Sequence, residues 1–114
     1  MAERRRRNRK STFHYTQVLD RDSGKQIGRL VNITTEGMML ITTLPLATGT
    51  KLPIRMVLPR MVNDVDELEF NAEVRWCKPD ANPNYHAIGF KLENITREVS
   101  EIIGEMFHEF HLVG

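Results

Sequence analysis

The chain has 114 residues, 40% of them hydrophobic, and its sixteen basic and fifteen acidic residues leave a formal net charge of +1. This length suits one domain with a single modest core, and the composition is that of a globular protein, not of a disordered or fibrous one. A nearly neutral chain is not expected to coat nucleic acid over a broad face. The lone Cys77 excludes an internal disulfide and a cysteine-based metal site.

The first ten positions hold six of the sixteen basic residues, in the run Glu3-Arg-Arg-Arg-Arg-Asn-Arg-Lys10. Guanidinium groups bind phosphate oxygens in pairs and stay charged at physiological pH, so the run predicts binding of a small anionic ligand. We expect residues 1–11 to form a flexible basic arm and residues 12–114 to form the folded domain. The alternative is a solvated basic tail or a nonspecific nucleic-acid arm.

The basic run is followed by the polar segment Ser11-Thr-Phe-His-Tyr-Thr-Gln17, not by the apolar core of a signal peptide. No apolar run approaches the roughly 20 residues that a membrane span needs. Export and membrane insertion are therefore not expected, and we expect a cytoplasmic location.

From Thr12 to Lys91 the apolar residues recur mainly at spacing two, the period of a strand with one buried face. The alternation is clearest in two segments: Leu52, Ile54, Met56, Leu58, and then Phe70, Ala72, Val74, Trp76. It predicts that Trp76 is buried in the core. Six strands are expected, near 12–20, 26–33, 37–42, 51–58, 67–77 and 85–92, and this number of short strands predicts an all-β fold, a small antiparallel barrel.

Turn-forming residues separate the predicted strands. The expected connections are Asp22-Ser-Gly24, Thr35-Glu-Gly37, Ala47-Thr-Gly49, an acidic loop from Asn63 to Glu67, and Lys78 to Pro83.

After Asn94 the period changes to that of a helix, with Thr96 as a candidate N-cap and Glu98 in the first turn. One stripe of this amphipathic helix is apolar and is expected to pack on the barrel: Val99, Ile102, Ile103, Met106, Phe107, Phe110. His108 and His111 could share a face with Glu105, but nothing completes a ligand shell, so no metal site is predicted.

A second motif, Asn32-Ile-Thr-Thr-Glu-Gly37, lies between two apolar runs. Together with Arg5-Arg-Arg-Asn-Arg9 it resembles the R-x-x-x-R and D/N-x-S/T-x-x-G motifs of the PilZ domain, the bacterial receptor module for cyclic di-GMP. The segments Ala72-Glu-Val-Arg-Trp76 and Ile88-Gly-Phe-Lys-Leu92 agree with that family as well. The resemblance covers nearly the whole chain and implies a six-stranded antiparallel PilZ-like β-barrel with a C-terminal helix.

The resemblance also implies a ligand site formed by Arg5, Arg9, Asn32, Thr34 and Gly37. Arginines would bind the two phosphates and stack on a base, because cyclic di-GMP offers both. Asn32 stands where Asp is commonest, and its amide has one acceptor oxygen where a carboxylate has two. Gly37 would supply either a positive φ or a close backbone approach.

Arg4 precedes the first motif, and in this family a basic residue there accompanies an intercalated pair of nucleotides. The resemblance therefore implies a dimeric ligand, and an arm that is ordered by the ligand would relay the signal to a downstream protein partner. No cofactor is expected besides the ligand cyclic di-GMP.

Three other functions were weighed on the residues. Catalysis is not expected, because the chain has no activated nucleophile, no paired histidine and acid, and no phosphate-binding glycine loop. A PilZ-like module that has lost nucleotide binding and only contacts proteins is the main alternative, and Asn32 favours it. A barrel that binds single-stranded nucleic acid ranks last, because the aromatic residues fall mostly on the predicted core faces or in the helix.

Overall fold

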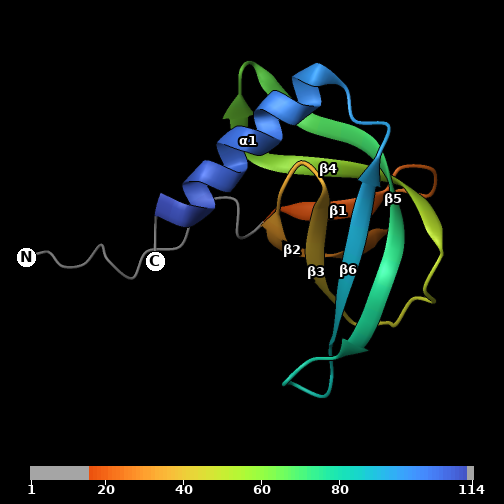
Figure 1. Cartoon of the computed structure of the whole chain (residues 1–114). Helices are drawn as coiled ribbons and strands as arrows, with labels where there is room; N and C mark the ends of the chain where they lie inside the picture. The colour runs from red at the N-terminus through yellow and green to blue at the C-terminus, as the bar shows by residue number, and fades with distance from the viewer. Residues whose placement is uncertain (1–15, 113–114) are drawn as a thin grey trace, which may run out of the picture.

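The computed structural model describes residues 16–112, without the side chains beyond Glu109. Six antiparallel strands close into a barrel in the order β1-β2-β3-β6-β5-β4, and one helix follows them (Figure 1). The elements are β1 (Gln17–Asp20), β2 (Gln26–Ile33), β3 (Gly37–Thr42), β4 (Lys51–Val62), β5 (Val65–Pro79), β6 (His86–Glu93) and α1 (Arg97–Leu112). The predicted six-stranded barrel with a C-terminal helix is confirmed. Of the predicted first strand, positions 12–15 lie outside the described residues.

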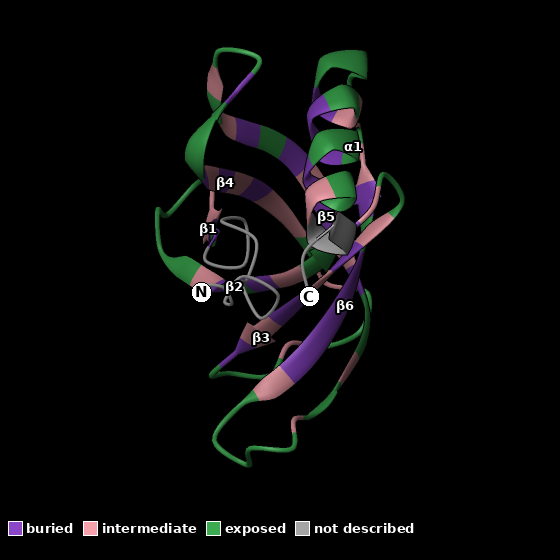
Figure 2. Ribbon diagram, turned by 90° about the vertical axis from the view of Figure 1, so that its left-hand side faces the viewer, coloured by how far each residue is buried: buried purple, intermediate pink, exposed green. Residues whose placement is uncertain are grey.

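The barrel interior holds the alternate apolar side chains that the sequence pattern predicted. On β4 the residues Ile54, Met56 and Leu58 are buried, and Leu52 is half-buried against them. Figure 2 shows this alternation along the strands, except on β6, which is buried almost continuously. Residues 87–90 of β6 are all buried. Because successive side chains of a strand point to opposite faces, the outer face of the barrel is also shielded from solvent at these positions.

The β4–β5 connection is shorter than predicted. Val62 pairs with Val65, and only Asn63 and Asp64 form the turn, with φ angles of 52° and 64°. Asparagine and aspartate tolerate this left-handed conformation, and two such residues in succession make a tight hairpin whose twist matches the strands. The expected loop from Asn63 to Glu67 was therefore wrong, because its last three residues are the first residues of β5.

Helix α1 lies across one end of the barrel, opposite the β5–β6 loop (Figure 1). Thr96 caps it as predicted, because its Oγ1 accepts a hydrogen bond from the backbone N–H of Val99 at 3.1 Å. Four residues of the predicted stripe join the barrel core: Val99, Ile102, Ile103 and Met106. Phe107 was expected in the same stripe but is 39% exposed, because it lies at the edge of the helix face that these four residues bury.

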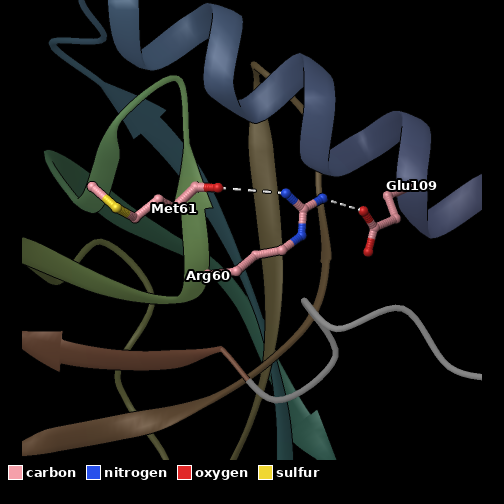
Figure 3. Close-up of polar contacts among 3 residues, drawn as sticks. All are labelled: Arg60, Met61 and Glu109. Carbon is pink, nitrogen blue, oxygen red and sulfur yellow. Dashed lines mark hydrogen bonds and ion pairs between the residues drawn. The ribbon is translucent and has the colours of Figure 1, made fainter.

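An ion pair also joins the helix to the barrel. Arg60, near the end of β4, donates one hydrogen bond to the carbonyl of Met61 and another to the carboxylate of Glu109 (Figure 3). The β4–β5 hairpin is thereby linked to the last turns of α1. Within residues 16–112 no helix is long and apolar enough to cross a membrane.

Candidate functional site

The predicted turn motif lies beside a groove of about 780 Å³ on the outer surface of the barrel. Residues 32–39, from β2, the turn and β3, line one side of it, and Arg75 and Trp76 of β5 line the other. Residues 89–92 of β6 lie between them, since β6 pairs with both β3 and β5. The three predicted site residues of the described chain, Asn32, Thr34 and Gly37, are therefore brought together in one groove.

Thr34 builds the turn that carries the motif. Its hydroxyl oxygen accepts hydrogen bonds from the backbone N–H groups of Glu36 at 3.1 Å and Gly37 at 3.2 Å. Its own backbone N–H donates to the carbonyl of Gly37 at 2.8 Å. Hydroxyl side chains commonly close turns in this way. The described hydrogen bonds of Thr34 thus fix the shape of the groove wall.

Asn32 is exposed at the start of this wall, beside a register shift between Leu30 and Asn32 in the β2–β3 pairing. Its side-chain oxygen accepts a hydrogen bond from the N–H of Ile33 at 2.8 Å. One lone pair of the amide oxygen is therefore used locally, and the N–H₂ group is available to donate to a ligand.

Gly37 is needed for a close approach and not for a positive φ. Its φ does not lie in the left-handed region, but a Cβ there would come within 2.7 Å of the carbonyl oxygen of Phe90. This contact arises because Gly37 pairs with Lys91 on β6. The glycine keeps the turn tightly packed on the floor of the groove.

Trp76 was predicted to be buried, and that prediction was wrong. It is 40% exposed, because β5 contains a bulge: Val74 pairs with Phe90 and Trp76 with Gly89, so Arg75 is an extra residue. The bulge moves Trp76 to the outer face, and Cys77 takes the next inward position, packed against the core.

The indole of Trp76 lies over the backbone of Gly89. A Cβ on that glycine would come within 2.2 Å of two indole atoms, so only glycine leaves room for the ring. The Trp76 side chain therefore covers the outer face of β6 at the groove. The ammonium group of Lys78 lies 5.3 Å from the centroid of the indole ring, within the range of a cation–π contact.

The groove also carries charge. Arg75 and Lys91 line it and are both exposed, and Glu36 contributes one carboxylate to the opposite side. A half-exposed indole, two cations and a polar turn suit a planar ligand that bears negative charge. The predicted arm residues Arg4, Arg5 and Arg9 lie outside the described residues, so their place relative to the groove stays a prediction.

Sequence reasoning missed Arg75, Trp76 and Lys91 as groove residues. The glycine at position 89 was the available signal for Trp76, because a glycine inside a strand often marks a bulge or a close approach.

The described residues hold no group of three or more His, Cys, Asp or Glu side chains placed to bind a metal ion. Nothing in the groove points to catalysis.

The volume of the groove lies within the range of about 300–1,000 Å³ that is usual for small-molecule sites. The family model for the PilZ domain matches residues 3–109, and the chain belongs to the PilZ domain family. PilZ domains are typically receptor and adaptor modules and not enzymes.

Several solved structures share the fold, and two of them are compared with this chain. One is the Bacillus subtilis inhibitor of motility, MotI/DgrA, with 17% identity and a TM-score of 0.70 over 96% of this chain. This chain spans 52% of that protein, about half its length. The other is the PilZ domain of YcgR from Escherichia coli with c-di-GMP, at 16% identity and a TM-score of 0.62, covering 96% of this chain and 93% of that one. A comparison with curated proteins found no match.

Proposed function

We propose that this PilZ domain is a receptor for cyclic di-GMP in the bacterial cytoplasm. The observation that carries the proposal is the meeting of the Asn32–Gly37 motif with the exposed indole of Trp76 in one groove. Two further facts support it: the chain belongs to the PilZ family, and the YcgR domain that shares its fold has a structure with c-di-GMP.

In this proposal the basic arm supplies the phosphate contacts. Arg5 and Arg9 bind phosphate oxygens and stack on a base, and the groove holds the guanine. Each charge-assisted hydrogen bond contributes roughly 1.5–3 kcal/mol, so loss of one arginine reduces the affinity on the order of tenfold to a hundredfold. Arg4 adds positive charge that favours an intercalated pair of nucleotides, which brings four phosphates together.

Trp76 provides the flat surface for a base. One face of the indole rests on Gly89, and the side chain is exposed enough to accept a planar ring. Stacking of a base on an aromatic side chain contributes about 1–3 kcal/mol. A base in this position competes with the ammonium group of Lys78 for the indole ring.

Ligand binding would change the surface around the groove, because the arm closes over it. A protein partner that distinguishes the two surfaces then senses the nucleotide, and the domain acts as an adaptor.

One observation favours the alternative, a PilZ module that contacts proteins without binding nucleotide. The acceptor oxygens of Asn32 and Thr34 already accept hydrogen bonds from the backbone of their own turn. The side-chain oxygens of the turn motif therefore have hydrogen-bond partners within the turn and do not require a ligand.

Binding of single-stranded nucleic acid is less well supported. Of the described aromatic side chains, Phe70 and Phe90 are buried in the core and Phe107 lies in the helix, as expected, whereas Trp76 and Tyr85 are in neither and are 40% and 38% exposed. The exposed ones lie on β5, in the β5–β6 loop and on α1. A stacking track needs aromatic side chains in succession along one groove.

The test is a titration of cyclic di-GMP into the full chain and into an Arg5→Ala/Arg9→Ala variant, by calorimetry and by tryptophan fluorescence. Because the chain has one tryptophan, the fluorescence reports on the groove alone. We expect saturable binding with a change in Trp76 emission, lost or strongly weakened in the variant, and no response to GTP. Absence of binding at micromolar nucleotide would leave the protein-contact module as the better function.

The same titration tests the role of Arg4. An intercalated pair predicts two nucleotides per protomer at saturation, and Arg4→Ala should shift this ratio toward one. A wild-type ratio of one nucleotide per protomer would rule out the dimeric ligand.

A further inference from the structure

The β5 bulge places two side chains of complementary chemistry at one point of the groove. Arg75 and Trp76 both face the position of Gly89, both are exposed, and both line the groove. A regular strand would turn neighbouring residues to opposite faces. Bulges re-aim side chains in this way beside functional sites.

Arg75 has no partner within the described chain. Arg21 donates to Asn71, Arg55 to Glu67, Arg60 to Glu109, and Arg97 pairs with Glu101. Arg75 and Arg29 are the described arginines whose side chains form neither an ion pair nor a hydrogen bond with residues 16–112. The donors of Arg75 are thus available to a ligand in the groove.

We infer that Arg75 reads the O6 and N7 edge of the guanine that stacks on Trp76, and so determines which base the groove accepts. This inference rests on the proposed function. A base stacked on the indole shares the groove with the long side chain of Arg75, since the two residues are neighbours at the bulge and both line the groove. Its edge is then within reach of the guanidinium group.

The chemistry of the two purines makes this contact selective. Guanine presents two acceptors, O6 and N7, which match the paired N–H groups of an arginine. Adenine presents a donor, its N6 amino group, where guanine has O6, so one arginine N–H would face another donor. The contact is more important here than in a site with aspartate at position 32, because Asn32 has one acceptor oxygen where a carboxylate has two, and that oxygen already accepts a hydrogen bond from the N–H of Ile33.

The experiment measures whether Arg75 and the guanine N7 act on each other. The full chain and its Arg75→Ala variant are each titrated with cyclic di-GMP and with its 7-deaza analogue, in which C–H replaces N7. We expect removal of N7 to weaken binding to the wild type by about tenfold to a hundredfold. In Arg75→Ala the two ligands should bind equally, because the partner of N7 is already gone.

The matched control is Arg29→Ala, which removes an exposed, unpartnered strand arginine that does not line this groove. It should keep the full difference between the two ligands. Thermal melting should show both variants as stable as the wild type, since both side chains are exposed and neither forms a hydrogen bond or an ion pair with residues 16–112.

Two results would overturn the inference while leaving the receptor function intact. One is unchanged affinity of Arg75→Ala for cyclic di-GMP. The other is an N7 effect of the same size in the wild type and in Arg75→Ala, which would make Arg75 only a charge near the phosphates. A wild-type chain that binds neither ligand would instead refute the proposed function itself.

Discussion

At the residue scale, Gly37 shows how the turn is fixed to the barrel. The carbonyl oxygen of Phe90 occupies the space that a side chain at this position would need. The carbonyl of Glu36 also accepts a hydrogen bond from the N–H of Leu92 at 3.0 Å, so the turn is bonded to β6 at the same place. Any shift of the turn away from β6 would change the shape of the groove.

Gly37→Ala should therefore destabilise the domain. The clash involves two backbone segments that cannot rotate away, and overpacking of this kind costs about 1–3 kcal/mol in the free energy of unfolding. Urea unfolding of the ligand-free protein measures it.

Gly104→Ala is the matched control for that substitution. Gly104 is exposed in the middle of α1 with open space around it, so alanine there should stabilise the domain by roughly 0.8–1 kcal/mol. Equal effects of the two substitutions would show that the turn adapts and that the contact with Phe90 is not a constraint.

The sequence left the role of Gly37 open between a positive φ and a close approach. Only the pairing of β3 with β6 decides between them, because the obstructing carbonyl belongs to a residue 53 positions later in the chain (90 − 37 = 53). The engagement of the Asn32 oxygen by its own neighbour was likewise invisible, since it depends on the local backbone conformation and not on residue type.

At the element scale, periodicity was sufficient to locate every strand and the helix. The ends of β2 and β3 agree with prediction because glycine and polar turn residues mark them clearly. The end of β4 and the start of β5 do not: β4 continues past position 58 to Val62, and β5 already begins at Val65, because the acidic residues that resemble a loop are part of the strand.

The position of Trp76 failed for a different reason. An alternating pattern predicts burial only while each residue of the strand pairs with one residue of its neighbour. A bulge inserts an unpaired residue, and the residues after it then point to the opposite face from the one predicted. The pattern Ala72, Val74, Trp76 reads as one face, but the inward position after Val74 belongs to Cys77. The bulge that exposes Trp76 in the groove is thus also the reason why the alternating pattern did not predict its exposure.

The N-cap of α1 was predicted from residue type and is confirmed by its hydrogen bond. Thr96→Ala should lower the free energy of unfolding by about 1 kcal/mol, because the N–H of Val99 loses its partner at the start of the helix that covers the core. Chemical denaturation measures the change.

Thr96→Ser is the control, since it retains the hydroxyl group and should stay within a few tenths of a kcal/mol of the wild type. If serine were as damaging as alanine, the methyl group and not the cap would be what stabilises this end of the helix.

At the scale of the whole molecule, the arginines proposed to bind the phosphates lie outside the stretch of sequence that holds the described core. Among the residues that the structure describes, the core cluster runs from Val18 to Met106, whereas the arginines proposed to bind the phosphates are Arg4, Arg5 and Arg9. Closure of the barrel satisfies the strand edges without any help from a ligand. The sequence therefore predicts a domain that folds first and binds with a segment outside its core.

This separation predicts how stability should respond to the ligand. Without nucleotide, the wild type and the Arg5→Ala/Arg9→Ala variant should melt at nearly the same temperature. A ligand that binds only the folded state at a hundred times its Kd adds about 2.7 kcal/mol, which for a domain of this size raises the wild-type Tm by about 10 °C or more. The variant should show little of this shift, and GTP should produce none in either protein.

Thermal melting with and without cyclic di-GMP measures both quantities at once. A variant that melts well below the wild type in the absence of ligand would show that the arm arginines stabilise the fold, and their effect on binding would then be indirect. A variant that melts like the wild type but keeps the full ligand shift would place the phosphate contacts elsewhere, and Arg75 and Lys91 are the cations already in the groove. Only equal melting without ligand together with a lost ligand shift supports an arm whose arginines act on the nucleotide alone.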